Sequence, residues 1–283
     1  EDVSITSGKV ITLDLAGYKL TNRANHTITN DGTLTIVDSS EDKTGTIDNI
    51  THAKATILNN GITTLNGGLF ERSAEAGTAP NANGNNSFYT IWNKGNMTIN
   101  DGVTVVNGNG TTTGKYSSVI ANLGTFSKTA ELTITGGSIS GGLYVKNDEY
   151  GKMTITGGKI SGGYAAAVFS YAELIITGGQ FENSNSRELV WAYNSANVTV
   201  TGGTYTSSYD AMLRVTTTEG STTISITPEE IVNNTGSLVK INAGQIINGT
   251  VNITTKEGNA QVTSSAIFTN VKAGNNGISI NAG

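Results

Sequence analysis

Apolar and polar residues alternate in one short phrase that occurs four times between Leu132 and Tyr205. The copies read LTITGGSI, MTITGGKI, LIITGGQF and VTVTGGTY, and they begin at Leu132, Met153, Leu174 and Val198. Alternation with a period of two predicts a strand with one buried and one wet face, and the Gly-Gly pair allows a turn after it. The offsets of 21, 21 and 24 residues predict a solenoid in which successive copies stack.

A second group of phrases shares an asparagine at one position. TITNDGTLTI begins at Thr27, and related phrases begin at Thr56, Thr90 and Val119. The shared residue lies two positions after an apolar one, so it belongs to the same inward face of a strand. Its copies are Asn30, Asn59, Asn93, Asn122 and Asn147. Stacked amides can bond to one another, and we expect an internal asparagine ladder that lapses at Ser170 and Ala192.

The alternation continues along the chain and predicts one all-β domain over residues 1–283, a solenoid of about eleven coils. The second strands of the coils are expected near Leu13, Ile36, Leu65, Ile99, Ile134, Ile155, Ile176, Val200, Ile224, Ile253 and Ile278. The excess length of some coils predicts loops at Glu71–Asn86, Asn107–Tyr116 and Thr125–Glu131. Pro228–Val232 resembles a capped helical turn.

Two phrases carry a resemblance to known proteins. ITLDLAGYKLTN from Ile11 and GTLTIVDSS from Gly32 resemble the β-helical repeat regions of large surface proteins from Firmicutes, including gut commensals. The wider pattern resembles the right-handed parallel β-helix superfamily that includes pectate lyases. This resemblance implies a single right-handed parallel β-helix, cut from an extracellular protein of a Gram-positive cell surface. It does not indicate the ligand, because members include lyases, hydrolases, tailspikes and adhesins.

Composition narrows the classes of partner. The formal charge is −5 and charged residues make up 14% of the chain, without the basic stripe that nucleic acids or membrane surfaces require. Cysteine is absent, which excludes disulfides and thiolate chemistry. No apolar run is long enough for a transmembrane helix. We expect no nucleic-acid partner, no membrane insertion, no cofactor and a monomeric state.

Recognisable catalytic parts are missing from the sequence. A lyase would need clustered carboxylates beside an Arg or Lys, but outward carboxylates do not recur at one position of consecutive coils. Asp148, Glu149 and Glu173 could hold a hard cation weakly, although a solvated loop explains them as well. The two histidines, His26 and His52, lack metal-ligand spacing. We therefore expect neither a catalytic nor a metal site, with an enzyme of unrecognised chemistry as the alternative.

Aromatic residues give the best lead to a binding site. They are 6% of the chain, yet Tyr144, Phe169, Tyr171, Trp191 and Tyr193 crowd into three successive coils. If Val168 and Val190 point inward, four of these rings point outward. They are Phe169, Tyr171, Trp191 and Tyr193. Trp92 shares the column of Phe169 and Trp191, and nearby side chains supply polar groups. The candidate ligand-binding residues are Trp92, Lys146, Phe169, Tyr171, Arg187, Trp191, Tyr193 and Arg214.

An exposed aromatic strip on a rigid sheet suits the stacking of sugars or the anchoring of a protein. We therefore expect a non-catalytic extracellular adhesin that recognises glycans or a host glycoprotein, such as mucin or immunoglobulin. The alternatives are a polysaccharide lyase or glycoside hydrolase and a purely structural stalk. The strip itself would serve no ligand if loops cover it or if inside and outside are reversed.

Overall fold

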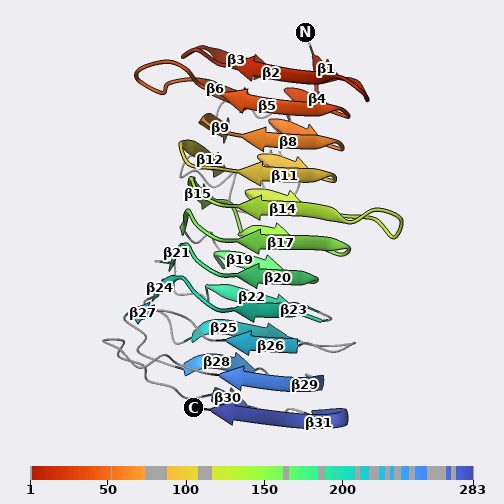
Figure 1. Cartoon of the computed structure of the whole chain (residues 1–283), viewed down its shortest axis with the longest axis vertical. Coiled ribbons are helices and arrows are strands. Elements are labelled where there is room, and N and C mark those ends of the chain that lie inside the picture. Colours follow the sequence, from red (N-terminus) through yellow and green to blue (C-terminus); the bar gives the residue numbers. More distant parts are fainter. Residues whose placement is uncertain are drawn as a thin grey trace.

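The computed structural model describes residues 2–51, 53–73, 88–107, 117–161, 166–183, 189–194 and 196–207. Beyond these it describes only the backbone of strands at 211–216, 223–226, 230–232, 237–241, 246–253, 266–268 and 272–282. The described residues form an all-β solenoid without helices, as expected. Each coil contributes one strand to each of two parallel sheets, and all but two coils have a described strand in a third. The coils stack along the long axis (Figure 1). Among the described residues no helix is long and apolar enough to cross a membrane.

Two of the sheets, here called sheets A and B, contain eleven strands each. Sheet A consists of β1 (Val3–Ile5), β4 (Ile28–Asn30), β7 (Ile57–Asn59), β10 (Ile91–Asn93), β13 (Ile120–Asn122), β16 (Val145–Asn147), β19 (Val168–Ser170), β22 (Val190–Tyr193), β25 (Ala211–Thr216), β28 (Ser237–Ile241) and β30 (Ala266–Phe268). Sheet B consists of β2 (Val10–Asp14), β5 (Thr33–Val37), β8 (Ile62–Leu65), β11 (Asn96–Ile99), β14 (Ala130–Ile134), β17 (Gly151–Ile155), β20 (Glu173–Ile176), β23 (Asn197–Val200), β26 (Thr223–Ile226), β29 (Ile246–Ile253) and β31 (Lys272–Ala282).

Sheet C contains nine strands. They are β3 (Lys19–Asn22), β6 (Thr46–Asn49), β9 (Gly68–Arg72), β12 (Val103–Asn107), β15 (Ser138–Gly141), β18 (Lys159–Ser161), β21 (Gln180–Asn183), β24 (Thr204–Ser207) and β27 (Glu230–Val232). The strand β27 covers part of the segment that resembles a capped helical turn, so that expectation is wrong for Glu230–Val232. Pairing with β24 extends this segment as a strand, which overrides its local helical signal.

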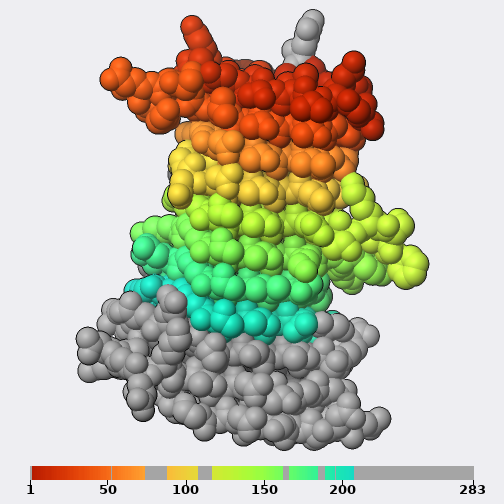
Figure 2. Space-filling view, viewed as in Figure 1, coloured from red at the N-terminus to blue at the C-terminus, as the bar shows by residue number. Residues whose placement is uncertain are grey.

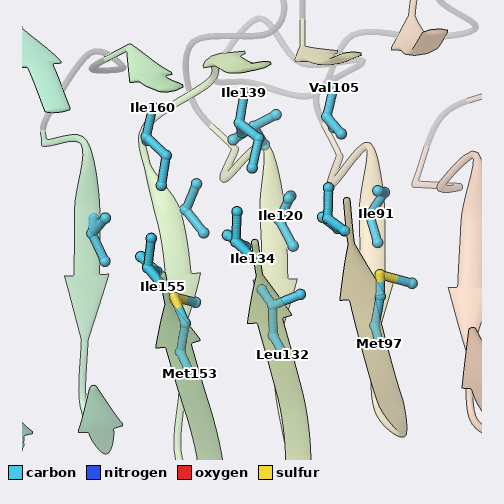
Figure 3. Packing of buried hydrophobic residues seen from close by; sticks show 14 of the residues in the cluster. Ile91, Met97, Val105, Ile120, Leu132, Ile134, Ile139, Met153, Ile155 and Ile160 are labelled. Carbon is cyan, nitrogen blue, oxygen red and sulfur yellow. The ribbon is translucent and has the colours of Figure 1, made fainter. Parts of the chain in front are cut away.

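The core is built from the inward side chains of all three sheets. Ile91, Met97 and Val105 come from sheets A, B and C of one coil, and all three point into the interior (Figure 3). Equivalent residues stack above and below them, so each coil buries its apolar side chains against its neighbours. A fully buried aliphatic side chain contributes about 1.5–3 kcal/mol, and this repeated burial holds the rod together.

The Gly-Gly turns between sheets B and C allow adjacent coils to approach closely. A Cβ at Gly157 would lie 2.1 Å from the Thr135 carbonyl oxygen of the preceding coil. Gly158 has a φ of +82°, a conformation that a side chain disfavours. The repeated pair therefore meets two requirements, a close contact at its first position and a left-handed backbone at its second.

The asparagine ladder runs inside the bend between sheets A and B. Each amide nitrogen donates to the side chain of the next coil, and all five asparagines are fully buried. The distances are 3.0 Å from Asn30 to Asn59, 2.7 Å from Asn59 to Asn93, 2.7 Å from Asn93 to Asn122 and 2.9 Å from Asn122 to Asn147. The predicted ladder is confirmed.

The ladder does not lapse at Ser170, which corrects the expectation for that residue. Asn147 Nδ2 donates to Ser170 Oγ at 3.1 Å, and this hydroxyl donates in turn to the Ala172 carbonyl at 2.9 Å. A serine hydroxyl both accepts and donates, so it ends the chain of amides without leaving a buried partner unpaired. The ladder ends one coil later than expected, since Ala192 has no polar group.

The expected second strands all fall within sheet B, and their register agrees from Leu13 to Val200. Val200 then pairs with Ile226 and not with Ile224. Both isoleucines lie on the same face of β26, so the alternating pattern fits either register. The loops expected at Glu71–Asn86 and Asn107–Tyr116 fall mostly outside the described residues.

The third expected loop, at Thr125–Glu131, is a short hairpin followed by the start of β14. The backbones of Thr125 and Lys128 bond to each other in both directions, at 2.8 and 3.0 Å. The tip carries Phe126, which is 90% exposed. In the space-filling view this segment projects from the side of the stack of coils (Figure 2).

Candidate functional site

The outward face of sheet A carries one column of paired residues across five neighbouring strands, β10 to β22. Strand pairing aligns Trp92, Ala121, Lys146, Phe169 and Trp191, one from each strand. The neighbouring positions Val168 and Val190 point into the core and are fully buried. The predicted orientation of this column is therefore confirmed, because strand residues alternate between the two faces.

Aromatic rings from several coils pack against one another on this face. We call this group the aromatic strip, and it consists of Phe88, Tyr89, Trp92, Tyr144, Phe169, Tyr171, Trp191 and Tyr193. Phe169 lies at its centre, stacked on Tyr144 at 4.7 Å and meeting the edge of Trp191 at 5.0 Å between ring centroids. Tyr171 and Tyr193 complete the group at 4.8 Å from each other.

Phe169 itself is only 4% exposed, so its expected role in an exposed strip is wrong. The ring points outward, but Tyr144, Tyr171, Trp191 and Tyr193 surround it. The four surrounding rings are half-buried and therefore keep part of their surface in solvent. Phe169 is the base of the strip, and the surrounding rings are the surface that a ligand would contact.

The other end of the strip is centred on Trp92. Phe88 and Tyr89 pack against its ring at 5.7 and 6.0 Å. His26 lies at 6.3 Å from both Phe88 and Trp92. Burial, assisted by the nearby charge of Lys54, lowers the pKa of His26 to about 4. The imidazole is therefore neutral near pH 7, and its Nδ1 accepts a 2.8 Å hydrogen bond from the Ala55 amide.

The Trp92 end and the Phe169 end of the strip are separated by the strand β13. Between the two ends lies Ala121, an outward residue that is only 1% exposed. A small side chain at this position leaves room for larger neighbours to cover it. The two ends share the outward column of sheet A.

Lys146 and Asp148 form a polar pair beside the rings. Lys146 Nζ lies 2.5 Å from Asp148 Oδ2 and 5.6 Å from the centroid of the Tyr171 ring. Burial alone would lower the pKa of Lys146, but the hydrogen bond and charge of Asp148 outweigh burial and raise it. Burial also raises the pKa of Tyr144 and of Tyr171. The lysine is therefore charged and paired, and both phenols keep the proton that they can donate to a ligand.

Two of the predicted site residues cannot be placed as side chains. Arg187 lies outside the described residues, and only the backbone of Arg214 is described. That backbone pairs with Trp191 and so continues the outward column into β25. The structure brings together Lys146, Phe169, Tyr171, Trp191 and Tyr193 from the predicted set. Trp92 lies in the same outward column, two strands from Lys146.

Two of the three carboxylates considered for a cation, Asp148 and Glu173, are paired with lysines. Asp148 pairs with Lys146, and Glu173 pairs with Lys152 at 3.4 Å. Within the described part of the chain, no group of three or more histidine, aspartate or glutamate residues is arranged to hold a metal ion.

The sequence prediction missed part of the strip. Phe88 and Tyr89 directly precede Thr90, the first residue of the phrase that forms β10. Tyr144 was grouped with the crowded aromatic residues but left out of the candidate binding set, and it lies directly before β16. Asp148 directly follows β16. Aromatic residues immediately before a strand of sheet A could have predicted these members of the strip, because such positions lie beside the outward column of the neighbouring coil.

Comparison with family models, with curated proteins and with solved structures finds no match to this chain. The function must therefore be argued from the site itself.

Proposed function

We propose that the chain is a non-catalytic binding module of an extracellular bacterial surface protein, which recognises glycans, free or on a host glycoprotein such as mucin or immunoglobulin. The observation that carries the proposal is the half-exposed set of rings around Phe169, held on a rigid parallel sheet. Aromatic faces stack against the apolar faces of sugars, and their rigidity limits the entropy lost on binding.

The polar groups beside the rings suit the same ligand. Sugar hydroxyls need both donors and acceptors, which the phenols of Tyr144 and Tyr171 provide. Asp148 adds carboxylate oxygens, and Lys146 adds an ammonium group within the same cluster. Most ligand-binding surfaces combine apolar contact area with a few polar groups that fix orientation, and this face has that composition.

A structural role for the rings is the second candidate, and a specific observation favours it. Phe169 is buried by its neighbours, so these rings hold adjacent coils together whether or not a ligand binds. The two roles differ at the rim. A structural role requires only the buried base, whereas binding requires the half-exposed Trp191, Tyr171 and Tyr193.

The test is a screen of the purified chain on an array of glycans and host glycoproteins, repeated with Trp191→Ala and with Phe126→Ala. Phe126 is exposed on the hairpin and lies outside the strip, so its variant is the matched control. We expect hits that Trp191→Ala weakens by about tenfold or more, equivalent to about 1.4 kcal/mol, and that Phe126→Ala leaves unchanged. Hits that both variants retain would contradict the proposed site. An array without hits would leave the structural role.

A further inference from the structure

The outward column of sheet A is longer along the rod than its individual strands are across it. From Trp92 to Trp191 it crosses four strand spacings of about 4.8 Å, or about 19 Å in all. Along a single strand, by contrast, β19 offers only three residues, or about 10 Å. An elongated ligand therefore gains the most contact when it lies along the rod axis, across the strands.

The spacing of the column also matches a repeating ligand. Strand pairing places one outward residue in each coil, in register, from Trp92 to Trp191. The separation of neighbouring strands is comparable to the length of one pyranose residue in an extended glycan chain. Each sugar of such a chain would lie over one coil. Trp92, Lys146 and Trp191 are half-exposed, whereas Ala121 and Phe169 are covered by neighbouring side chains, which would contact the sugar in their place.

The charges along the strip disfavour an acidic chain. Lys146 is already paired with Asp148, and Lys94 Nζ lies over the Trp92 ring at 5.2 Å from its centroid. Both ammonium groups thus already interact with the protein, and an acidic ligand would have to compete with Asp148. Protonated phenols and a compensated ion pair suit hydroxyl and acetamido groups better than carboxylates.

From these three observations we infer that the strip binds an uncharged linear glycan that runs along the rod axis, with about one sugar per coil between β10 and β22. The inference rests on the proposed function and adds to it the class, length and direction of the ligand. It assigns the two ends of the bound chain to Trp92 and Trp191.

The two ends can be monitored separately, because the chain contains only two tryptophans and both belong to the strip. In Trp191→Phe the tryptophan emission reports only Trp92, and in Trp92→Phe it reports only Trp191. Each variant is titrated with oligomers of β-1,4-linked glucose, β-1,4-linked N-acetylglucosamine and α-1,4-linked galacturonic acid, from the disaccharide to the hexasaccharide. Circular dichroism establishes that both variants keep the fold.

We expect at least one uncharged series to bind about tenfold or more tightly as the disaccharide is lengthened to the pentasaccharide, with little further gain for the hexasaccharide. The long oligomers should change the emission of both tryptophans. Binding that does not depend on length, a hexasaccharide that changes only one tryptophan, or binding of galacturonate oligomers alone would overturn the inference.

The same experiment separates this inference from the proposed function. If no series binds but array hits are still lost in Trp191→Ala, the strip binds another kind of glycan and only the present inference fails. If no series binds and the array is silent, both fail.

Discussion

The two faces of sheet A hold successive coils together through different interactions. The inward face carries the asparagine ladder, fully buried and hydrogen bonded from Asn30 to Ser170. The outward face carries aromatic rings, which leave one side in solvent. Both meet on β19, where Ser170 ends the ladder and Phe169 is the base of the strip. The ladder and the strip therefore lie on opposite faces of the same strands from β10 to β19, and only the strip continues to β22.

The difference also separates stability from recognition. Every ladder amide is enclosed by protein partners, so the ladder can contribute to stability but cannot reach a ligand. On the outward face only the base of the strip is enclosed, and its rim contacts solvent. Substitutions on the inward face should therefore affect folding, and substitutions at the rim should affect binding.

The largest expected effect is that of Asn93→Leu, in the middle of the ladder. Asn93 Nδ2 donates to the Gly95 carbonyl, the Asn122 side chain and the Glu131 carbonyl, and its Oδ1 accepts from Asn59. The variant leaves several buried groups unpaired and should cost about 4 kcal/mol, at about 1–3 kcal/mol for each group. Urea unfolding followed by circular dichroism measures this loss.

The matched control for this variant is Asn100→Ala. Asn100 also bonds to an asparagine of the neighbouring coil, Asn66 at 2.7 Å, but it lies at the surface. Water can replace that bond, so the control should lose less than about 1 kcal/mol. Equal losses in the two variants would show that a hydrogen bond in the internal ladder contributes no more to stability than one at the surface.

A smaller loss is expected for Phe169→Ala at the base of the strip. Removing a buried ring costs about 3 kcal/mol, whereas Phe126→Ala on the exposed hairpin should change the unfolding free energy by less than about 0.5 kcal/mol. The same urea titrations compare the two. If Phe169→Ala is as harmless as Phe126→Ala, the rings do not hold the coils together.

Acid should weaken the Trp92 end of the strip through His26. The pKa of His26 is about 4 in the folded chain, below the usual value of about 6.5. The folded state therefore disfavours the protonated form, so this contribution is complete above pH 6.5 and is lost as pH falls toward 4. We expect a loss of about 2 kcal/mol, since His26 is only half-buried and solvent reduces the effect.

Unfolding free energies at pH 7 and pH 4.5 measure this loss, with His26→Gln as the comparison. The variant cannot be protonated in this range and should lose less stability on acidification than the unaltered chain. The same pH dependence in both chains would assign the effect to other groups.

The smallest effect is expected for Ser170→Ala, at the end of the ladder. Asn147 Nδ2 keeps its second bond, to the Glu173 carbonyl at 2.8 Å, so only part of its hydrogen bonding is lost. We expect a loss of about 1 kcal/mol. A loss as large as that of Asn93→Leu would mean that the hydroxyl stabilises the coils as much as an amide within the ladder.

The sequence predicts the parts of the fold that repeat at fixed positions. The ladder was predictable because each asparagine follows an inward apolar residue, such as Ile91, by two positions. The outward orientation of Trp191 followed from the same alternation, since Val190 is buried. Period-two patterns determine which face a residue occupies, and they do so independently of loop length.

Other features depend on packing in three dimensions. The burial of Phe169 results from rings on neighbouring coils, which alternation alone does not describe. Several strands of sheet C end in buried polar residues, which the sequence did not reveal because Arg72 and Gly141 interrupt the series of asparagines. The buried residues are Asn22, Asn49, Arg72, Asn107 and Asn183. Arg72 occupies a position where the next coil has Asn107, so the sequence shows no common residue type there. Its guanidinium donates a hydrogen bond to the Thr51 carbonyl at 2.7 Å.

The assignment of recognition to the outward face of sheet A is tested most directly by Tyr171→Ala, with Tyr18→Ala as the control. For each variant we would measure the affinity for the glycans that bind on the array, together with the free energy of unfolding. Tyr171 is a half-exposed rim residue, and Tyr18 is an exposed tyrosine far along the rod on the first coil. We predict that Tyr171→Ala loses about tenfold or more in affinity and less than about 1 kcal/mol in stability, while Tyr18→Ala changes neither. Unchanged glycan binding in Tyr171→Ala, with the fold intact, would contradict the assignment of recognition to the outward face of sheet A.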